Sequence, residues 1–176
     1  MKISVHAMSV DLLANTLANL SHLLEKGHAH AVARKFDPAV LIAARLAPDM
    51  FPLPRQIQIA CDVAKFGVAR LAGVEAPKFE DKEQTLEELR GRIARTIDFI
   101  KGVPASALEG SEDRTIKVPG RDRTLEFKGL DYLSRFVIPN VFFHVTIAYA
   151  ILRHNGVDVG KNDFLTGSGP GFSQSA

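Results

Sequence analysis

Apolar residues recur every three or four positions in several stretches of the chain, which is the spacing of one face of an α-helix. The first stripe runs through residues 10–24, and Gly27 is expected to end that helix. Asp37 followed by a proline predicts the start of a short helix. A second long stripe occupies residues 55–71, with Gly73 placed to stop it. The first half of the chain is therefore predicted to be helical.

The second half contains two more helical patterns. Thr85 and Glu88 have the spacing of a capping box, ahead of an apolar stripe that continues to Ile100. Residues 129–155 are helical again, and Pro139 lies inside them. This last segment is expected to kink at the proline or to break into a short helix followed by a longer one. Four long helices together predict a helical bundle.

Two segments depart from the helical period. Between Asp113 and Lys128, the stretches RTIKV and RTLEF alternate apolar and polar residues around the turn PGRD, which predicts a short β-hairpin. After residue 155 the pattern is irregular, and residues 168–176 have the glycine and serine content of a flexible tail. We therefore expect a single all-α domain over residues 1–167, a four-helix bundle with a hairpin inserted between helices three and four.

Composition limits the partners and the compartment. The 176 residues include 22 Lys and Arg against 20 Asp and Glu, a net charge of +2, and the basic residues are scattered, so no nucleic-acid surface is indicated. The lone Cys61 excludes an intramolecular disulfide and suits the cytoplasm. The N-terminus lacks the apolar core of a signal peptide, and no run of about 18 apolar residues occurs, so neither export nor a membrane span is expected.

The stretch VFFHVTIAYAILRH, residues 141–154, is apolar around nearly the whole circumference of its predicted helix. Such a helix is either central in the bundle or shared with a second subunit, so we predict a homodimer whose interface includes it, alone or with the first helix. His144 lies within the stretch, and a buried histidine must satisfy both ring nitrogens, with a carboxylate, a carbonyl, a water or a metal.

The second long helix carries polar side chains that could be hydrogen-bond partners of His144. Asp62 and Gln58 lie on one polar stripe with Arg55 and Lys65, and either could reach His144 across the bundle to orient a general base or a ligand. The other interpretation of that stripe is a solvated face with an Asp62–Lys65 pair. The candidate ligand-binding residues are His144, Asp62, Gln58 and Tyr149.

The positions of the remaining reactive side chains in the sequence indicate structural roles. Cys61 lies in an apolar stripe, and the pattern favours packing over a nucleophile. His154 is suited to capping a helix end, and His22 points away from the first helix's apolar face. His28 and His30 lack a third ligand. No phosphate-binding loop, GxSxG elbow, HExxH helix or EF-hand is present, and no cofactor is indicated.

Residues 44–65, the end of the third helix and above all PNVFFHVTIAYAILRHNGVDVGKNDF, residues 139–164, resemble an uncharacterised bacterial domain-of-unknown-function family allied to the DinB/YfiT-like four-helix superfamily. The resemblance implies that fold over residues 3–167 and an ancestry among putative metalloenzymes. Metal-bearing relatives use one histidine from helix two and a later pair four residues apart. His144 could be one of that pair, but Ala148 stands where its partner belongs, and IQIACDVAK contains no histidine.

Three functions follow from these observations. The first is binding of a small molecule in an inter-helix cavity near His144, with the three-histidine metal site degenerate or absent. The second is a homodimeric structural or binding protein without chemistry. The third is a metal-dependent hydrolase or thiol transferase with an atypical ligand set, such as His144, Asp62 and water.

Overall fold

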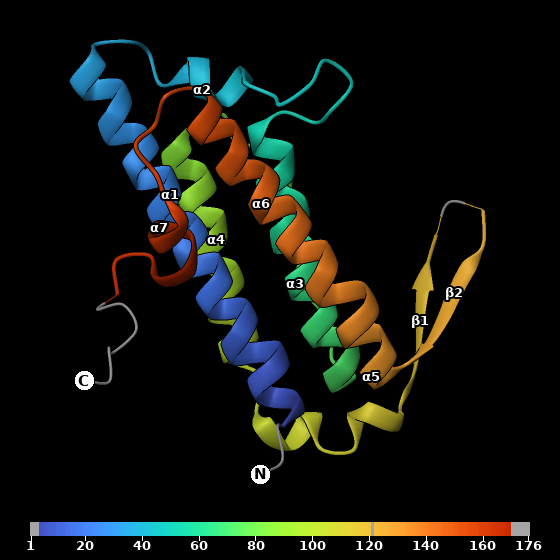
Figure 1. The fold of residues 1–176 in the computed structure, drawn as a ribbon. Coiled ribbons are helices and arrows are strands. Elements are labelled where there is room, and N and C mark those ends of the chain that lie inside the picture. The colour runs from blue at the N-terminus through green and yellow to red at the C-terminus, as the bar shows by residue number, and fades with distance from the viewer. Residues whose placement is uncertain (1–3, 121, 170–176) are drawn as a thin grey trace.

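A computed structural model describes residues 4–120 and 122–169 of the chain. Within this part, four long helices lie side by side as a bundle (Figure 1). They are α1 (Leu12–Arg34), α3 (Leu53–Ala72), α4 (Leu86–Lys101) and α6 (Ile138–His154). The fold predicted from the spacing of apolar residues, a helical bundle with a small hairpin, is confirmed.

Shorter elements connect the long helices. The described chain also contains π-helical turns at Ala7–Asp11 and Tyr132–Val137, 3-10 turns at Ala105–Leu108 and Ser111–Asp113, the helices α2 (Ala39–Ala43), α5 (Gly129–Asp131) and α7 (Lys161–Thr166), and the strands β1 (Thr115–Pro119) and β2 (Thr124–Lys128). The two strands pair antiparallel, with Thr115 opposite Lys128, and project from the bundle (Figure 1). The predicted hairpin is confirmed.

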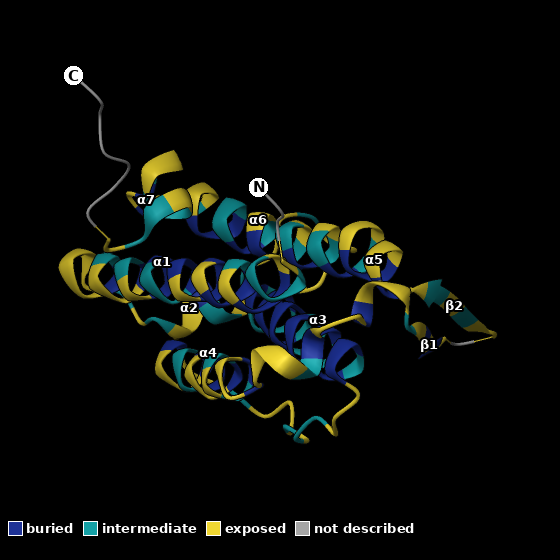
Figure 2. Ribbon diagram, turned by 90° about the horizontal axis from the view of Figure 1, so that it is seen from below, coloured by how far each residue is buried: buried dark blue, intermediate teal, exposed yellow. Residues whose placement is uncertain are grey.

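The core lies where the inner faces of the four long helices meet (Figure 2). Leucines from α1, aliphatic residues from α3 and α4, and the inner face of α6 are almost completely shielded from solvent. Local signals begin and end these helices as expected. Thr85 and Glu88 form both hydrogen bonds of the capping box at the start of α4, and Gly73 ends α3 with a φ of 72°, a conformation that glycine adopts without strain.

The end of α1 was predicted wrongly. The helix continues past Gly27 for two further turns to Arg34, and Lys35, with a φ of 58°, caps its end. Gly27 is buried, and a Cβ atom there would lie 3.1 Å from Cδ2 of Leu152. The glycine therefore allows α6 to pack closely against α1, and it does not stop the helix.

The segment from Gly129 to His154 runs as one helical rod despite Pro139 (Figure 1). The expected disturbance takes the form of the π-helical turn Tyr132–Val137, directly before the proline. By length and composition alone, this rod is long and apolar enough to cross a membrane. Its most apolar 18-residue window has a mean hydropathy of 1.5, and 33% of the residues in that window are buried. Its inner face packs on α3 and α1.

The segment after α6 was expected to be irregular, and this is wrong for Lys161–Thr166, which form α7. Asp163 fixes α7 to the bundle, since its carboxylate accepts hydrogen bonds from Lys26 (2.9 Å), the ring of His22 (3.3 Å) and the backbone N–H of Gly160 (2.8 Å). These contacts also leave His22 only 20% exposed, which contradicts its predicted exposure. The predicted tail falls largely outside the described residues.

Candidate functional site

His144 is held by a chain of two hydrogen bonds that links α6 to α3. Its Nδ1 lies 2.7 Å from Oε1 of Gln56, and Nε2 of Gln56 donates to the backbone carbonyl of Phe51 at 3.0 Å. The bond to the carbonyl orients the Gln56 amide, so that its oxygen faces the imidazole. Because that oxygen can only accept, Nδ1 carries the ring proton, and Nε2 is left with a free lone pair.

Nε2 of His144 is accessible from outside. It makes no hydrogen bond to the described residues, and the buried side-chain nitrogen and oxygen atoms without a partner in this part of the chain are Nδ1 of His22 and Nε of Arg92. Burial of the ring lowers the pKa of His144 below 6.5, and the positive charge of Arg55 lowers it further. At neutral pH the site therefore presents an uncharged imidazole that can accept a hydrogen bond or a proton.

Asp62 and Gln58 were expected to reach His144, and the structure places both elsewhere. Asp62 pairs with Lys65 at 2.9 Å and Arg92 at 3.0 Å, and Gln58 donates to Glu83 at 3.0 Å. The reason is rotation about α3: relative to Gln56, Gln58 lies about 200° and Asp62 about 240° around the helix. Gln56 faces α6, whereas the predicted polar stripe faces α4.

That stripe belongs to a buried network of charges centred on Arg92, whose side chain is fully shielded from solvent. Its guanidinium binds Asp62 at 3.0 Å, Asp81 at 2.9 Å and Glu83 at 3.1 Å. We call Arg92, Asp62, Asp81, Glu83 and Lys65 the Arg92 cluster. The Asp62–Lys65 pair expected for a solvated face is present, but Lys65 is only 1% exposed while Asp62 is 29% exposed, so the face is only partly solvated.

The cluster connects the segment between α3 and α4 to both helices. Burial acts to raise the pKa of Glu83, but hydrogen bonds from Gln58, from its own backbone N–H and from Arg92 hold that pKa below 4.5. Asp81 also pairs with Arg55, the residue directly before Gln56. The cluster therefore also fixes Arg55, whose charge contributes to the lowered pKa of His144.

Comparison with known proteins identifies the family of this chain and a similar solved structure. Residues 5–165 match the family described as Domain of unknown function (DUF1993). The chain belongs to the DUF1993 family. It is also similar to a DinB family member protein from Shewanella denitrificans, whose crystal structure superposes with a TM-score of 0.85 at 41% identity, over 97% of this chain and 96% of that one. No curated protein matches the chain.

Over residues 4–120 and 122–169, the side chains do not come together as the three-histidine site that the resemblance to metal-bearing relatives implies. His144 contacts Gln56 on the second long helix, and Ala148 contributes only a methyl group one turn further along α6. Among the described residues, no three His, Cys, Asp or Glu side chains come together as a metal site. An amide, one imidazole and a methyl group do not fit the ligand set that the superfamily uses.

The other predicted candidates lie away from His144 in this DUF1993 fold. Tyr149 stacks edge-on against Phe164 and donates a long hydrogen bond of 3.4 Å to the carbonyl of Val159, on the side covered by the C-terminal segment. Cys61 packs in the core as predicted, and burial raises the pKa of its thiol to about 12, so it remains protonated and unreactive. Neither residue adds chemistry to the His144 site.

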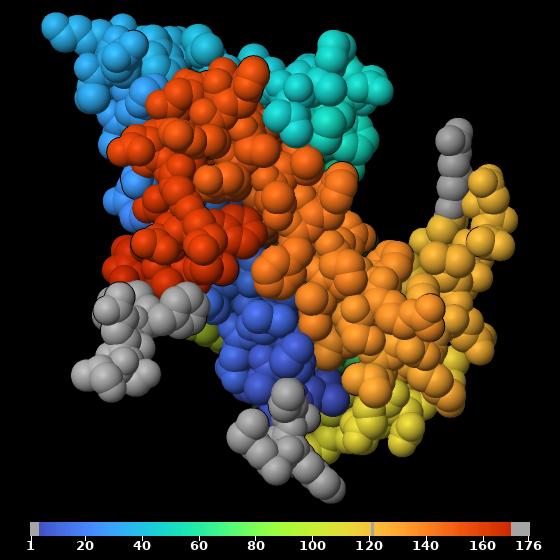
Figure 3. Space-filling view, viewed as in Figure 1, coloured from blue at the N-terminus to red at the C-terminus, as the bar shows by residue number. Residues whose placement is uncertain are grey.

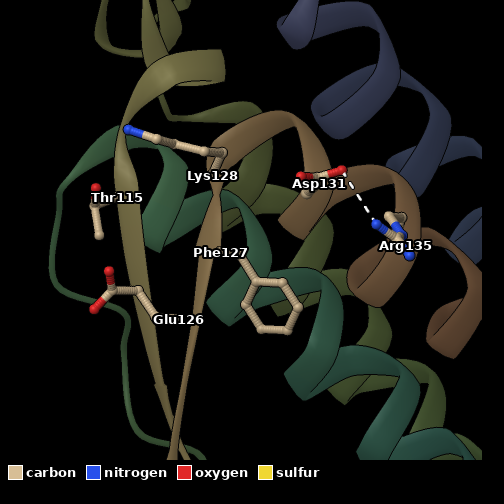
Figure 4. Close-up of a pocket in the computed structure, with 6 residues that line it drawn as sticks. All are labelled: Thr115, Glu126, Phe127, Lys128, Asp131 and Arg135. Atoms are coloured by element: carbon tan, nitrogen blue, oxygen red, sulfur yellow. Dashed lines mark ion pairs between the residues drawn. The ribbon is translucent and has the colours of Figure 1, made fainter.

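Hollows on the surface of the DUF1993 chain lie elsewhere. One of about 600 Å³ separates the hairpin from α5 and is lined by Phe127, Lys128 and the ion pair Asp131–Arg135 (Figure 4). Another of about 590 Å³ lies beside the Arg92 cluster, under Phe79 and Arg95. His144 lines neither of them.

Sequence reasoning missed Gln56 and Arg92. Each is a polar residue beside an apolar stripe: Gln56 precedes Ile57, and Arg92 lies between Leu89 and Thr96 on the inner side of α4. Such a position is the sequence signal that could have identified them, because a long polar side chain next to core positions requires a buried partner.

Proposed function

We propose that this DinB-like protein binds a small polar molecule beside α3 and α6, with Nε2 of His144 accepting a hydrogen bond from it. The observation that supports the proposal is the Phe51–Gln56–His144 chain, which selects one tautomer and leaves Nε2 accessible and without a partner among the described residues. The ring of Phe51, the residue whose carbonyl orients Gln56, is exposed and offers apolar contact to a ligand.

The tautomer and the binding role can be tested separately. At neutral pH, nitrogen-15 NMR is expected to show a protonated Nδ1 and an unprotonated Nε2 for His144, with a pKa below 6.5. In a thermal-shift screen of small organic acids, alcohols and amines, stabilising compounds are expected to lose their effect in His144→Ala and keep it in His154→Ala, an exposed histidine on the same helix. Compounds that stabilise both variants equally contradict the proposal.

We further propose that the protein forms a homodimer through the outer face of α6. Of the two explanations for its apolar circumference, a central place in the bundle does not hold, because α6 forms a broad strip of one surface (Figure 3). Phe143 is 56% exposed, and Phe142, Ile147 and Ala150 are only partly covered. An apolar surface of this kind on one helix supports a two-fold contact with a second copy.

The dimer has a direct test. Phe143→Lys is expected to convert a dimer at micromolar concentration into a monomer in sedimentation velocity, because the contact would have to bury an unpaired charge. Val74→Lys, which changes an exposed apolar residue beyond the end of α3, should leave the dimer intact. A native chain that sediments as a monomer contradicts the proposal.

A metal-dependent hydrolase or transferase finds less support, because a ligand set is not assembled among the described residues. A cytoplasmic location is supported by the single thiol, Cys61, which is free and buried.

A further inference from the structure

A hollow of about 650 Å³ lies at the end of the bundle where the first described residues meet the turns that follow α4 (Figure 1). Three parts of the chain line it: residues 4–6, the 3-10 turns between residues 105 and 112, and Leu130 of α5. A hollow of this volume accommodates a small organic molecule. His144 does not line it, so it is separate from the site described above.

Much of the lining is apolar. Val5, Ala105, Leu108 and Leu130 all contribute to it. Leu108 belongs to the core and is only 2% exposed, whereas Leu130 is 59% exposed. A molecule in the hollow would therefore cover a large apolar side chain that is otherwise in contact with water, which favours a ligand with an apolar body.

The charged part of the lining is acidic. Glu109 and Glu112 are both exposed, and neither forms an ion pair with a described residue. The other ionisable group is His6, whose Nδ1 lies 3.5 Å from a carboxylate oxygen of Asp11. The described lining contains neither lysine nor arginine. The two glutamates therefore attract a cation that the described lining does not itself supply.

We propose that this hollow binds a small amphipathic amine, with its apolar body against Leu108 and Leu130 and its ammonium group between Glu109 and Glu112. The ammonium would donate charge-assisted hydrogen bonds to the carboxylates, which are stronger than those of a neutral donor. An anion of the same shape would meet repulsion from the two glutamates. The proposal thus commits to the sign of the ligand's charge as well as to its apolar part.

Three probes with the same body separate charge from apolar contact: 4-phenylbutylamine, 4-phenylbutanol and 4-phenylbutyrate. In calorimetric titrations of the native protein at neutral pH and low salt, the amine is expected to bind at least about tenfold more tightly than the alcohol, and the carboxylate more weakly than either. In NMR spectra the amine should shift the backbone amide resonances of Leu108 and Gly110, which line the hollow.

Variants assign the ammonium and the body to their contacts. In Glu109→Gln/Glu112→Gln, the amine should weaken about tenfold, to the affinity of the alcohol. Leu130→Ser should weaken the amine and the alcohol alike, by about fivefold. Glu87→Gln at the start of α4 and Val32→Ser in the last turn of α1 are exposed controls that should change neither affinity. Thermal unfolding of each variant checks that the fold is intact.

Several results would overturn the proposal: failure of the amine to bind at millimolar concentration, equal affinities of the amine and the alcohol, or binding that leaves the amides of Leu108 and Gly110 unshifted. A preference for the amine that survives the double glutamine variant would do the same. His144→Ala should leave the affinity for the amine unchanged, and a loss of binding in that variant would place the amine at the other site.

Discussion

Arg92→Ala is expected to lower the free energy of unfolding by about 3 kcal/mol, because it removes the main cationic partner of the buried Glu83 carboxylate. It also removes a partner of Asp62 and Asp81, which are 29% and 38% exposed. The Arg92 side chain is fully shielded from solvent and binds Asp62, Asp81 and Glu83. Of these acids, Glu83 is only 6% exposed and would keep Gln58 and the distant Arg95 as partners. Urea denaturation monitored by circular dichroism measures the loss.

Arg90→Ala is the matched control. Arg90 lies two residues away on α4, is 32% exposed and pairs with Glu87 and Glu25 on the surface, so its loss should cost under about 1 kcal/mol. Arg92→Met keeps much of the volume without the charge and should resemble Arg92→Ala. Equal small losses for Arg90→Ala and Arg92→Ala would show that the cluster contributes little to stability.

The same variant should change the response to acid. The pKa of Glu83 lies below 4.5 in the folded protein, so its contribution to stability is complete above that pH and is lost as the pH falls through the folded pKa. Arg92 is one cause of the lowered pKa, and Arg92→Ala should therefore be less sensitive to a drop from about pH 5 to about pH 3. An unchanged acid response would argue against the coupling between the two side chains.

Much of the fold could be predicted because its signals are local. The capping box at Thr85 and Glu88 and the left-handed Gly73 are defined by residues within one turn of a helix end, so the sequence contains them completely. The hairpin follows from the change of apolar period from three or four residues to two.

The errors concern features set by contacts distant in sequence. Gly27 has the appearance of a helix stop, and only its contact with Leu152 shows that it serves close packing. The helix α7 has no buried residues, and its position depends on Asp163 reaching Lys26 on α1. Neither contact can be deduced from the neighbouring residues.

The sequence identified His144 in the candidate site but not its partner, because that contact too is distant in sequence. His144 was identified because a polar ring in an apolar helix needs a partner, but the partner depends on which face of α3 meets α6. The structure shows that Gln56 lies on that face, while Asp62 turns towards Arg92. Gln56 and Asp62 lie on opposite flanks of the apolar stripe of α3, and apolar periodicity does not say which flank meets α6.

Close packing of α3 against α6, on which the site depends, leads to the second large effect. Gly67→Ala is expected to destabilise the protein, since a Cβ atom at Gly67 would lie 2.7 Å from Cγ1 of Val137 and 3.1 Å from its Cγ2. Val137 is β-branched and helical, so it cannot rotate away, and the overpacking should cost about 1–3 kcal/mol. Urea denaturation measures this loss against the native chain.

Gly91→Ala is the control that separates the packing effect of an added methyl group from its effect on helix propensity. A Cβ atom there would meet only the flexible end of Arg95, at 3.7 Å, so this variant should gain up to about 1 kcal/mol from the better helix former. If the strain at Gly67 moves α6 away from α3, the hydrogen bond between Gln56 and His144 should weaken, and the Nδ1 proton of His144 should exchange faster with water in Gly67→Ala than in Gly91→Ala. Similar stabilities for the two variants would mean that the contact between these helices can relax, and that the orientation of His144 does not depend on it.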